Sequence, residues 1–391
     1  MLRLARLGTA LTAVALLLVT LPACDFGEGE SLFDPDAQTN PAPVVSSVSP
    51  TGVVLAGVDV ITIEGTNFSA TPSDNTVVFD DQQGSTASGV VLEASPTQLR
   101  VRVPNLPNPA LRFRVAVIGA QDFSNSIDFP LTAAIVPYGE LARTEVPFGI
   151  AADDDGTLYL SLENEGSAVG ITAIAPDGTR SPYFDSGFPW AALARVDGRL
   201  FGVRRLRAVF ELPEGGRQGV LAAFQPASVS LFSIAGGPDG SVYAGGNSDV
   251  IYRIAPDGSS SETVFPSSVE ALVSNTSTLY AVSGEAPAQV YAITIEGDGS
   301  LGAPTPIATL PAAGSALEVA ADGTLYVGLS REEDPVVTVS GGAVEPLYPG
   351  VLNGPVQSLA YGAGSQLYMV TAATSSERAN VFRIETRRDG S

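Results

Sequence analysis

Histidine and lysine are missing from this 391-residue chain, and cysteine occurs only once. Without histidine there is no Ser-His-Asp triad, no imidazole general base and no imidazole metal site. The single cysteine excludes an intramolecular disulfide and a cysteine-rich zinc site. A bound metal would therefore have to be a hard ion such as Ca²⁺ or Mg²⁺, held by carboxylate, amide or carbonyl oxygens.

Positive charge is scarce as well. All 20 basic residues are arginine, 42 residues are acidic, and the formal net charge is −22. A charge of this sign and size repels nucleic acid and anionic lipid, which argues against a nucleic-acid partner. Hydrophobic residues make up 45% of the sequence, which indicates a globular protein. A length of 391 residues is enough for more than one hydrophobic core.

The single cysteine ends an N-terminal secretion pattern. Met1 to Arg6 is basic, Leu7 to Leu21 is apolar apart from Gly and Thr, and Leu21-Pro-Ala-Cys24 follows. The apolar run is short for a membrane span and is typical of a signal peptide. Its ending resembles a bacterial lipobox, which implies a signal peptide over residues 1–23 and acylation of Cys24. The alternative is an ordinary signal peptide cut near Ala23, leaving a free thiol.

These features predict a protein of the bacterial cell envelope that contacts the membrane through its lipid anchor alone. We expect it on the outer membrane or the cell surface, with a periplasm-facing position as the alternative. Residues 24–42 are acidic and aperiodic, so they are predicted to form a flexible tether.

Residues 43–132 alternate apolar and polar positions between regularly spaced turns, the pattern of a small β-sandwich. The segments Ser49-Pro50, Ile61-Thr-Ile-Glu-Gly-Thr-Asn-Phe68 and Ser95-Pro-Thr-Gln-Leu-Arg-Val-Arg-Val-Pro104 follow in order. They resemble an IPT/TIG immunoglobulin-like domain. The resemblance implies a spacer or an interaction module, and none of these residues is predicted to be catalytic.

The remaining chain repeats a turn followed by a strand that carries an aromatic residue. The six aromatics, spaced 37 to 46 residues apart, are Tyr159, Phe201, Tyr243, Tyr280, Tyr326 and Tyr368. A strand-rich repeat of this length predicts a β-propeller. Residues 138–391 resemble NHL-type and SMP-30/gluconolactonase-like six-bladed propellers. The predicted fold is therefore all-β: an immunoglobulin-like β-sandwich followed by a six-bladed propeller, expected to be monomeric.

Each repeat can be divided into four strands, named A to D from the propeller axis outward. The last repeat has only three, predicted over residues 356–361, 366–371 and 380–385. Residues 140–146 are predicted to supply its fourth strand, so that N- and C-terminal strands pair and close the ring.

The connections between strands predict where a site lies. A–B and C–D turns share one face of a propeller, while B–C loops and D–A connections share the other. Because the Asp-Gly turns of the first face are short, we expect the variable chemistry on the second. The candidate ligand-binding residues on that face are Phe188, Trp190, Arg204, Arg205, Arg207, Asn164, Asn247, Asp249, Glu285 and Asn353.

Two sets of these candidates have alternative interpretations. The loop that carries Arg204, Arg205 and Arg207 could clamp a carboxylate, a sulfate or an acidic glycan, or its arginines could pair with acidic residues of the protein itself. Trp190 could grip a sugar ring, or it could fill the core between blades.

A second candidate site is a column of residues near the start of the A strands, which should face the central channel. Its members are Gly149, Ala192, Ser233, Glu270, Glu318 and Ser358. Glu270 and Glu318 could hold Ca²⁺ or Mg²⁺, or raise each other's pKa. SMP-30-like enzymes surround a divalent ion with Glu, Asn and Asp, but no Asn or Asp completes such a set here. The alternative is a pair of carboxylates in a water-filled channel.

The sequence favours a non-catalytic envelope protein whose propeller binds a glycan, a peptide or a partner protein and needs no cofactor. One alternative is a Ca²⁺- or Mg²⁺-dependent lactonase or hydrolase of the SMP-30 kind. A second is an assembly scaffold of an envelope complex.

Overall fold

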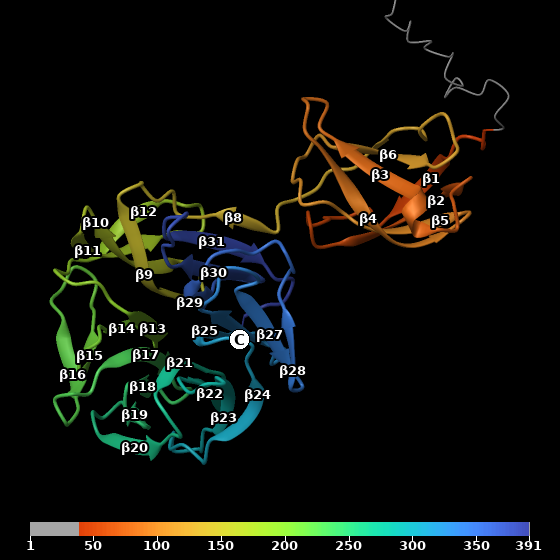
Figure 1. The fold of residues 1–391 in the computed structure, drawn as a ribbon. Coiled ribbons are helices and arrows are strands. Elements are labelled where there is room, and N and C mark those ends of the chain that lie inside the picture. The colour runs from red at the N-terminus through yellow and green to blue at the C-terminus, as the bar shows by residue number, and fades with distance from the viewer. Residues whose placement is uncertain (1–38, 391) are drawn as a thin grey trace, which may run out of the picture.

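The computed structural model describes residues 39–390, which form two β-domains (Figure 1). The predicted signal peptide, Cys24 and the predicted tether up to residue 38 lie outside the described residues. Within residues 39–390 the only helical segment is one 3-10 turn, η1 (Pro72–Asp74), and no helix could cross a membrane. The all-β fold class is thus confirmed, with an immunoglobulin-like sandwich followed by a six-bladed propeller.

The sandwich contains seven strands in the order β1-β2-β5-β4-β3-β6-β7. Their bounds are β1 (Val44–Ser49), β2 (Val60–Thr66), β3 (Asn75–Asp80), β4 (Thr86–Ser95), β5 (Gln98–Arg102), β6 (Arg112–Val117) and β7 (Ile127–Asp128). Alternate residues of β5 and β6 are buried, as the period of two predicted. The buried side chains include Phe79 and Phe113, whose ring centroids lie 5.4 Å apart.

The propeller consists of six four-stranded antiparallel sheets. Blade one contains β9 (Glu145–Ala152), β10 (Leu158–Asn164), β11 (Ser167–Ile174) and β12 (Arg180–Phe184). Blade two contains β13 (Ala192–Val196), β14 (Arg199–Val203), β15 (Ala208–Glu211) and β16 (Gly219–Ala223). Blade three contains β17 (Leu231–Gly236), β18 (Val242–Gly246), β19 (Val250–Ile254) and β20 (Ser260–Val264). Blade four contains β21 (Val269–Ser274), β22 (Thr278–Ser283), β23 (Gln289–Thr294) and β24 (Thr305–Thr309). Blade five contains β25 (Gly314–Val319), β26 (Leu325–Leu329), β27 (Val336–Ser340) and β28 (Ala343–Pro346). Blade six contains β29 (Val356–Tyr361), β30 (Gln366–Thr371), β31 (Asn380–Glu385) and β8 (Ile135–Pro137).

The ring closes through β8, which pairs with β31 in the register Ile384 to Ile135 and Phe382 to Pro137. Closure by an upstream strand is confirmed, but its predicted position over residues 140–146 is wrong. Gly139 and Glu140 have φ values of 77° and 45°, which a β-strand cannot accommodate. They redirect the chain from blade six to blade one, so that Glu145 begins β9 instead.

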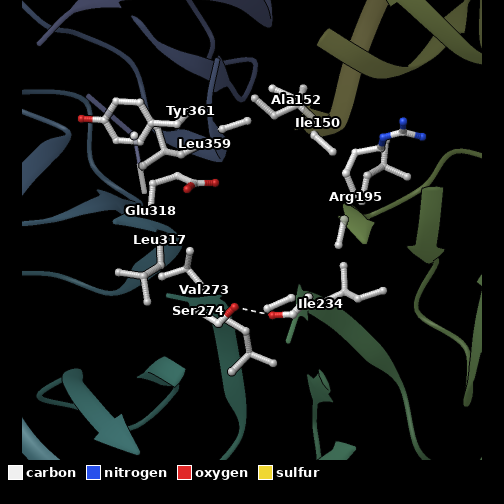
Figure 2. Close-up of a pocket in the computed structure, with 18 of the residues that line it drawn as sticks. Ile150, Ala152, Arg195, Ile234, Val273, Ser274, Leu317, Glu318, Leu359 and Tyr361 are labelled. Atoms are coloured by element: carbon white, nitrogen blue, oxygen red, sulfur yellow. Dashed lines mark hydrogen bonds between the residues drawn. The ribbon is translucent and has the colours of Figure 1, made fainter. Parts of the chain in front are cut away.

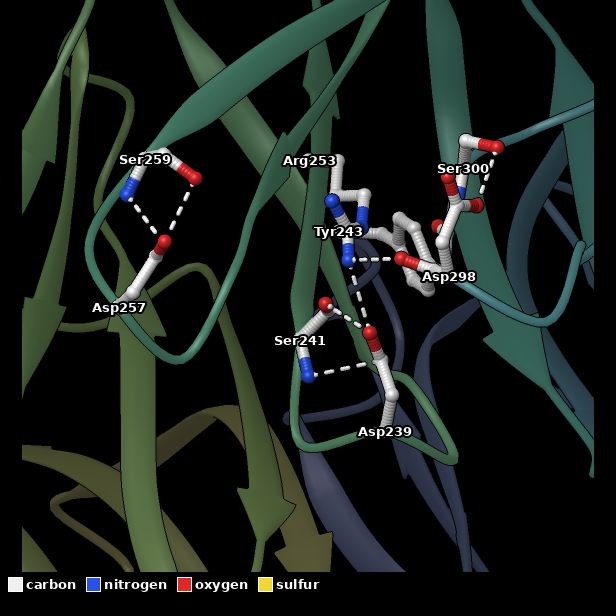
Figure 3. A network of polar contacts seen from close by, with 9 residues as sticks. Asp239, Ser241, Tyr243, Arg253, Asp257, Ser259, Asp298 and Ser300 are labelled. Carbon is white, nitrogen blue, oxygen red and sulfur yellow. Dashed lines mark hydrogen bonds and ion pairs between the residues drawn. The ribbon is translucent and has the colours of Figure 1, made fainter.

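The Asp-Gly turns are held by the aspartate side chain, which accepts a hydrogen bond from the backbone N–H two residues later (Figure 3). The three pairs in the figure are Asp239 with Ser241 (3.0 Å), Asp257 with Ser259 (2.9 Å) and Asp298 with Ser300 (3.0 Å). Arg253 donates to the Asp239 carboxylate at 2.8 Å and also to the carbonyl of Asp298, on the neighbouring blade. These turns therefore connect blades to one another as well as strands.

The sandwich contacts the propeller directly. Leu55 of the sandwich, Ala134 of the connection and Val351 of the propeller form a small buried cluster. Beside it, Arg387 makes a two-pronged ion pair with Asp59, with N–O distances of 2.9 and 2.6 Å. The two domains are thus joined by packed side chains in addition to the connecting chain.

Candidate functional site

The central channel of the propeller is a cavity of about 1430 Å³. Its walls are the A strands, and the A–B turns of all six blades surround one mouth. We expected variable chemistry on the opposite face, whereas this mouth lies on the face of the Asp-Gly turns. These turns are short, so they surround the mouth without covering it.

Strand pairing identifies which A-strand residues are equivalent in the six blades. The residue opposite the repeated aromatic of strand B is, from blade one to blade six, Ala151, Ala194, Ala235, Val273, Glu318 and Ala360. We call these six positions the small-residue ring. Five are Ala or Val, so the ring leaves room in the channel, and Glu318 is its only polar member.

Glu318 projects its carboxyl group into the channel (Figure 2). Leu317, Leu359 and Tyr361 lie around it on the same wall. Although the side chain is open to channel water and only half-buried, the blades enclose it, and this burial raises its pKa to about 8. At neutral pH the group therefore holds its proton, and it can both donate and accept a hydrogen bond.

Glu270 and Glu318 line the same channel at different levels. A β-bulge at Glu270 displaces the register, and Glu318 lies three positions further along its strand, roughly 10 Å at the usual rise per residue. The Glu270 carboxylate accepts a hydrogen bond from the Ser268 hydroxyl at 2.8 Å. The other members of the predicted column, Gly149, Ala192, Ser233 and Ser358, lie near the level of Glu270.

The residues present do not fit a resident divalent ion. Ca²⁺ takes six to eight oxygen ligands, usually including several carboxylates. Among residues 39–390 there is no cluster of three or more acidic or cysteine side chains that could hold a metal. We therefore derive no chemistry through a metal at Glu270 and Glu318.

The mouth of the channel is acidic. Asp153, Asp154, Asp155, Asp197 and Asp389 line it, and Arg195 is the only basic residue among the cavity-lining residues of the described chain. The Arg195 guanidinium turns away from the centre and stacks over the Tyr159 ring, 4.8 Å from its centroid (Figure 2). An anionic ligand would meet repulsion at this mouth.

On the opposite face, the structure brings Phe188, Trp190 and Arg204 together. Arg204 stacks over Phe188 and Phe210, with its guanidinium carbon 4.1 and 4.9 Å from the ring centroids, and burial lowers its pKa. Trp190 is completely buried and packs against Phe184 and Phe210. Its indole therefore fills the core between blades one and two and is not available to a ligand at the surface.

The other candidates of that face do not converge on Arg204. Asn247 holds the connection into blade three, since its amide accepts from the Ser230 N–H at 2.7 Å and donates to the Ser228 carbonyl at 3.0 Å. Asn164 ends β10 in blade one. Asp249, Glu285 and Asn353 are exposed in loops of different blades.

The small-residue ring was missed because the column was aligned on the starts of the A strands, where bulges shift the register. Counting back from the repeated aromatic would have found it. Each ring residue precedes the aromatic of its blade by seven or eight positions, and Glu318 precedes Tyr326 by eight.

Comparison with known proteins supports this architecture. Residues 43–130 match the model of the IPT/TIG domain, so the sandwich has this domain's sequence pattern as well as its fold. A search of curated proteins finds no sequence match.

Solved structures share the fold at low identity. An auxiliary nutrient binding protein from Bacteroides thetaiotaomicron is 12% identical, with a TM-score of 0.50 over 90% of this chain and 98% of its own. A gluconolactonase from Xanthomonas campestris is 17% identical, with a TM-score of 0.52 over 64% of this chain and 89% of its own. A PQQ-bound aldose sugar dehydrogenase from Streptomyces coelicolor is 19% identical and covers 64% of this chain and 97% of its own, with a TM-score of 0.47. The likeness to the first two structures shows a common fold and no more.

Proposed function

We propose that this chain is a non-catalytic binding protein of the cell envelope, anchored through an acylated Cys24, whose propeller binds a short uncharged glycan in the central channel. The observation that carries the proposal is the channel itself, a cavity of about 1430 Å³ in which Glu318 alone interrupts a ring of Ala and Val. Small-molecule sites combine apolar walls with placed polar groups, and serine and glutamine side chains also line this channel.

The chemistry of the wall supports an uncharged polyol. A protonated Glu318 both donates to and accepts from hydroxyl groups, while Val273 and Tyr361, which are partly exposed in the channel wall, offer apolar surface to the faces of sugar rings. The acidic mouth disfavours anionic sugars. The fold shared with a nutrient binding protein is consistent with uptake of such a ligand.

Calorimetric titration with a panel of neutral oligosaccharides tests this proposal. Glu318→Ala should weaken the best ligand about tenfold or more, the scale expected for one lost hydrogen bond at a buried site. Glu332→Ala removes an exposed carboxylate outside the channel and should leave the affinity unchanged. If no oligosaccharide binds, or if Glu318→Ala binds as tightly as the wild type, the channel is not the site.

A lactonase is the second candidate function, favoured by the raised pKa of Glu318. A carboxyl group that titrates near neutral pH is suited to proton transfer, and a gluconolactonase shares this propeller fold. Hydrolysis of aldonolactones by the wild type, lost in Glu318→Gln, would establish this function in place of simple binding. Retention of the activity in EDTA would show that it needs no divalent ion.

The anchor is tested separately. In cells that process lipoproteins, Cys24→Ala should move the protein from the membrane fraction to the soluble fraction. Continued membrane association of the variant would contradict the lipid anchor. A membrane protein that co-purifies with the chain in the absence of any small ligand would support the scaffold alternative.

A further inference from the structure

A second, smaller cavity of about 410 Å³ lies on the face opposite the acidic mouth. It is formed by the B–C loop of blade two and the connection from blade two to blade three. Its lining residues are Arg205, Leu206, Arg207, Ala208, Val220, Ala223, Ala227, Ser228, Val229 and Ser230. We call it the arginine groove.

The two arginines of this groove have no acidic partner in the described structure. Among the ion pairs formed within residues 39–390, none includes Arg205 or Arg207. Arg199 of the same blade, in contrast, pairs with Glu211. Two guanidinium groups are therefore free to receive an anion.

The loop that carries the arginines is fixed by backbone hydrogen bonds. The Arg205 N–H donates to the Leu231 carbonyl at 2.8 Å, and the Phe224 N–H donates to the Arg207 carbonyl at 2.8 Å. The Arg205 guanidinium lies over the ring of Phe232, 5.1 Å from its centroid. Stacking occupies the faces of a guanidinium and leaves the N–H donors at its edge available.

The rest of the groove is apolar. Leu206 is 48% exposed and Val220 is 63% exposed, unusual fractions for large aliphatic residues beside a pair of arginines. Ala208 and Val229 are buried beneath them. Basic groups next to an apolar wall suit a ligand that combines one anionic group with a hydrocarbon body.

We propose that the arginine groove binds a small organic carboxylate with a short alkyl chain, whose carboxylate is held by Arg205 and Arg207. A carboxylate matches the planar fork of a guanidinium, and the alkyl chain would cover Leu206 and Val220. The volume is that of a small-molecule site. The net charge of −22 disfavours a large acidic partner, so we assign the groove to a free carboxylate. This site is independent of the channel and its proposed glycan.

Sodium octanoate, titrated into the full-length protein below its micelle concentration, is the direct probe. We expect saturable binding that weakens about tenfold or more in the double variant Arg205→Gln/Arg207→Gln, since hydrogen bonds to charged groups are the stronger class. Arg217→Gln is the matched control, because Arg217 is an exposed arginine on the C–D turn of the same blade, outside the groove. Octanol should bind much more weakly than octanoate, since it lacks the charge.

Two further variants separate the possible outcomes. Leu206→Asp places a negative charge in the exposed wall and should abolish octanoate binding while the circular dichroism spectrum stays unchanged. Glu318→Gln should leave octanoate binding intact, so failure of the channel proposal and failure of this one are distinguishable. The inference is overturned if octanoate does not bind, if octanol binds equally well, or if the double variant binds like the wild type. It is also overturned if only a peptide with a free C-terminal carboxylate binds.

Discussion

Glu318 occupies a position where the other five blades have Ala or Val, and this single difference gives the channel its chemistry. A carboxyl group enclosed by protein prefers its neutral form, which is why its pKa rises from 4.5 to about 8. The folded protein therefore keeps a proton that the unfolded chain releases. Its stability should respond to pH through this one residue.

We predict that Glu318→Gln removes a pH-dependent loss of stability. Below pH 4.5 Glu318 is protonated in both the folded and the unfolded chain, so it does not change the free energy of unfolding there. Between pH 4.5 and 8 only the unfolded chain releases this proton, so the wild type loses stability as the pH rises. Above pH 8 the Glu318→Gln variant should be more stable than the wild type by about 2 kcal/mol. This is less than the full pKa shift implies, because channel water solvates part of the Glu318 carboxyl group. Urea unfolding from pH 4 to 9 measures this difference. Parallel pH profiles for the two proteins would contradict it.

Trp190 offers a prediction of a different kind, since its side chain is entirely buried among Phe184 and Phe210. Trp190→Ala should lower the free energy of unfolding by about 3–5 kcal/mol, as for other large-to-small changes in a core. Phe188→Ala, at a residue that is 55% exposed, should cost much less. Equal costs in thermal unfolding would show that Trp190 is not a core residue.

For single residues, the sequence indicated which residues were candidates for a site, but it indicated less well where their side chains lie. It singled out Trp190 as the only tryptophan, Arg204 as part of an arginine cluster and Glu318 as one of two carboxylates in the channel column. Whether Trp190 faced a ligand or the core depended on the direction of its side chain, which no local pattern specifies. The level of Glu318 in the channel depended on β-bulges, which leave no clear mark in a single sequence.

Among the elements, β8 bears the most on the integrity of the ring, because it is short and completes blade six. Its backbone pairs with β31, and hydrogen bonds flank it on both sides, from the Tyr138 N–H to the Val381 carbonyl and from the Glu385 N–H to the Ala134 carbonyl. The alternation of an antiparallel ladder then makes Val136 and Arg383 a hydrogen-bonded pair.

Val136→Pro should therefore open the ring at this point. Proline removes the N–H of the central pair and should cost about 1–3 kcal/mol, with faster amide hydrogen exchange in β31 than in the other blades. Val136→Thr keeps the N–H and a branched side chain, so it should behave like the wild type. Unchanged protection of β31 in the proline variant would show that β8 is not what closes the ring.

The strands themselves were largely predictable. Strands β29, β30 and β31 begin and end at the predicted residues, because residues typical of turns lie before and after each of them. The closing strand was misplaced because Gly139 and Glu140 take left-handed conformations, and Glu140 gives no sign of this from its residue type.

For the molecule as a whole, the contact between sandwich and propeller makes one body of two domains. It combines a buried apolar cluster around Val351 with the ion pair between Arg387 and Asp59. Its members come from four distant parts of the chain, so no periodicity or motif could have predicted it. The apolar cluster should contribute more than the ion pair, because Arg387 is largely exposed and such pairs contribute little.

We predict that Val351→Asp uncouples the two domains while each stays folded. A charge buried against Leu55 and Ala134 is costly, and separation of the domains relieves it. Small-angle X-ray scattering should show a larger radius of gyration and a broader distance distribution than in the wild type. Arg387→Ala should change the free energy of unfolding by less than about 1 kcal/mol and leave the scattering curve as it is. Identical scattering from Val351→Asp would contradict this account.

The pairing of β8 with β31 also determines the order in which the protein can be made. Strand β8 leaves the ribosome before any blade exists, and its partner β31 emerges only after the other five blades, so Ile135 stays unpaired until Ile384 has been made. The sandwich and the first five blades can each fold on local contacts, while the sixth depends on a contact that spans the whole propeller. Until β31 has emerged, β8 and the edge of β30 are unpaired backbones able to join other chains. Protection from aggregation is therefore most needed before β31 has emerged.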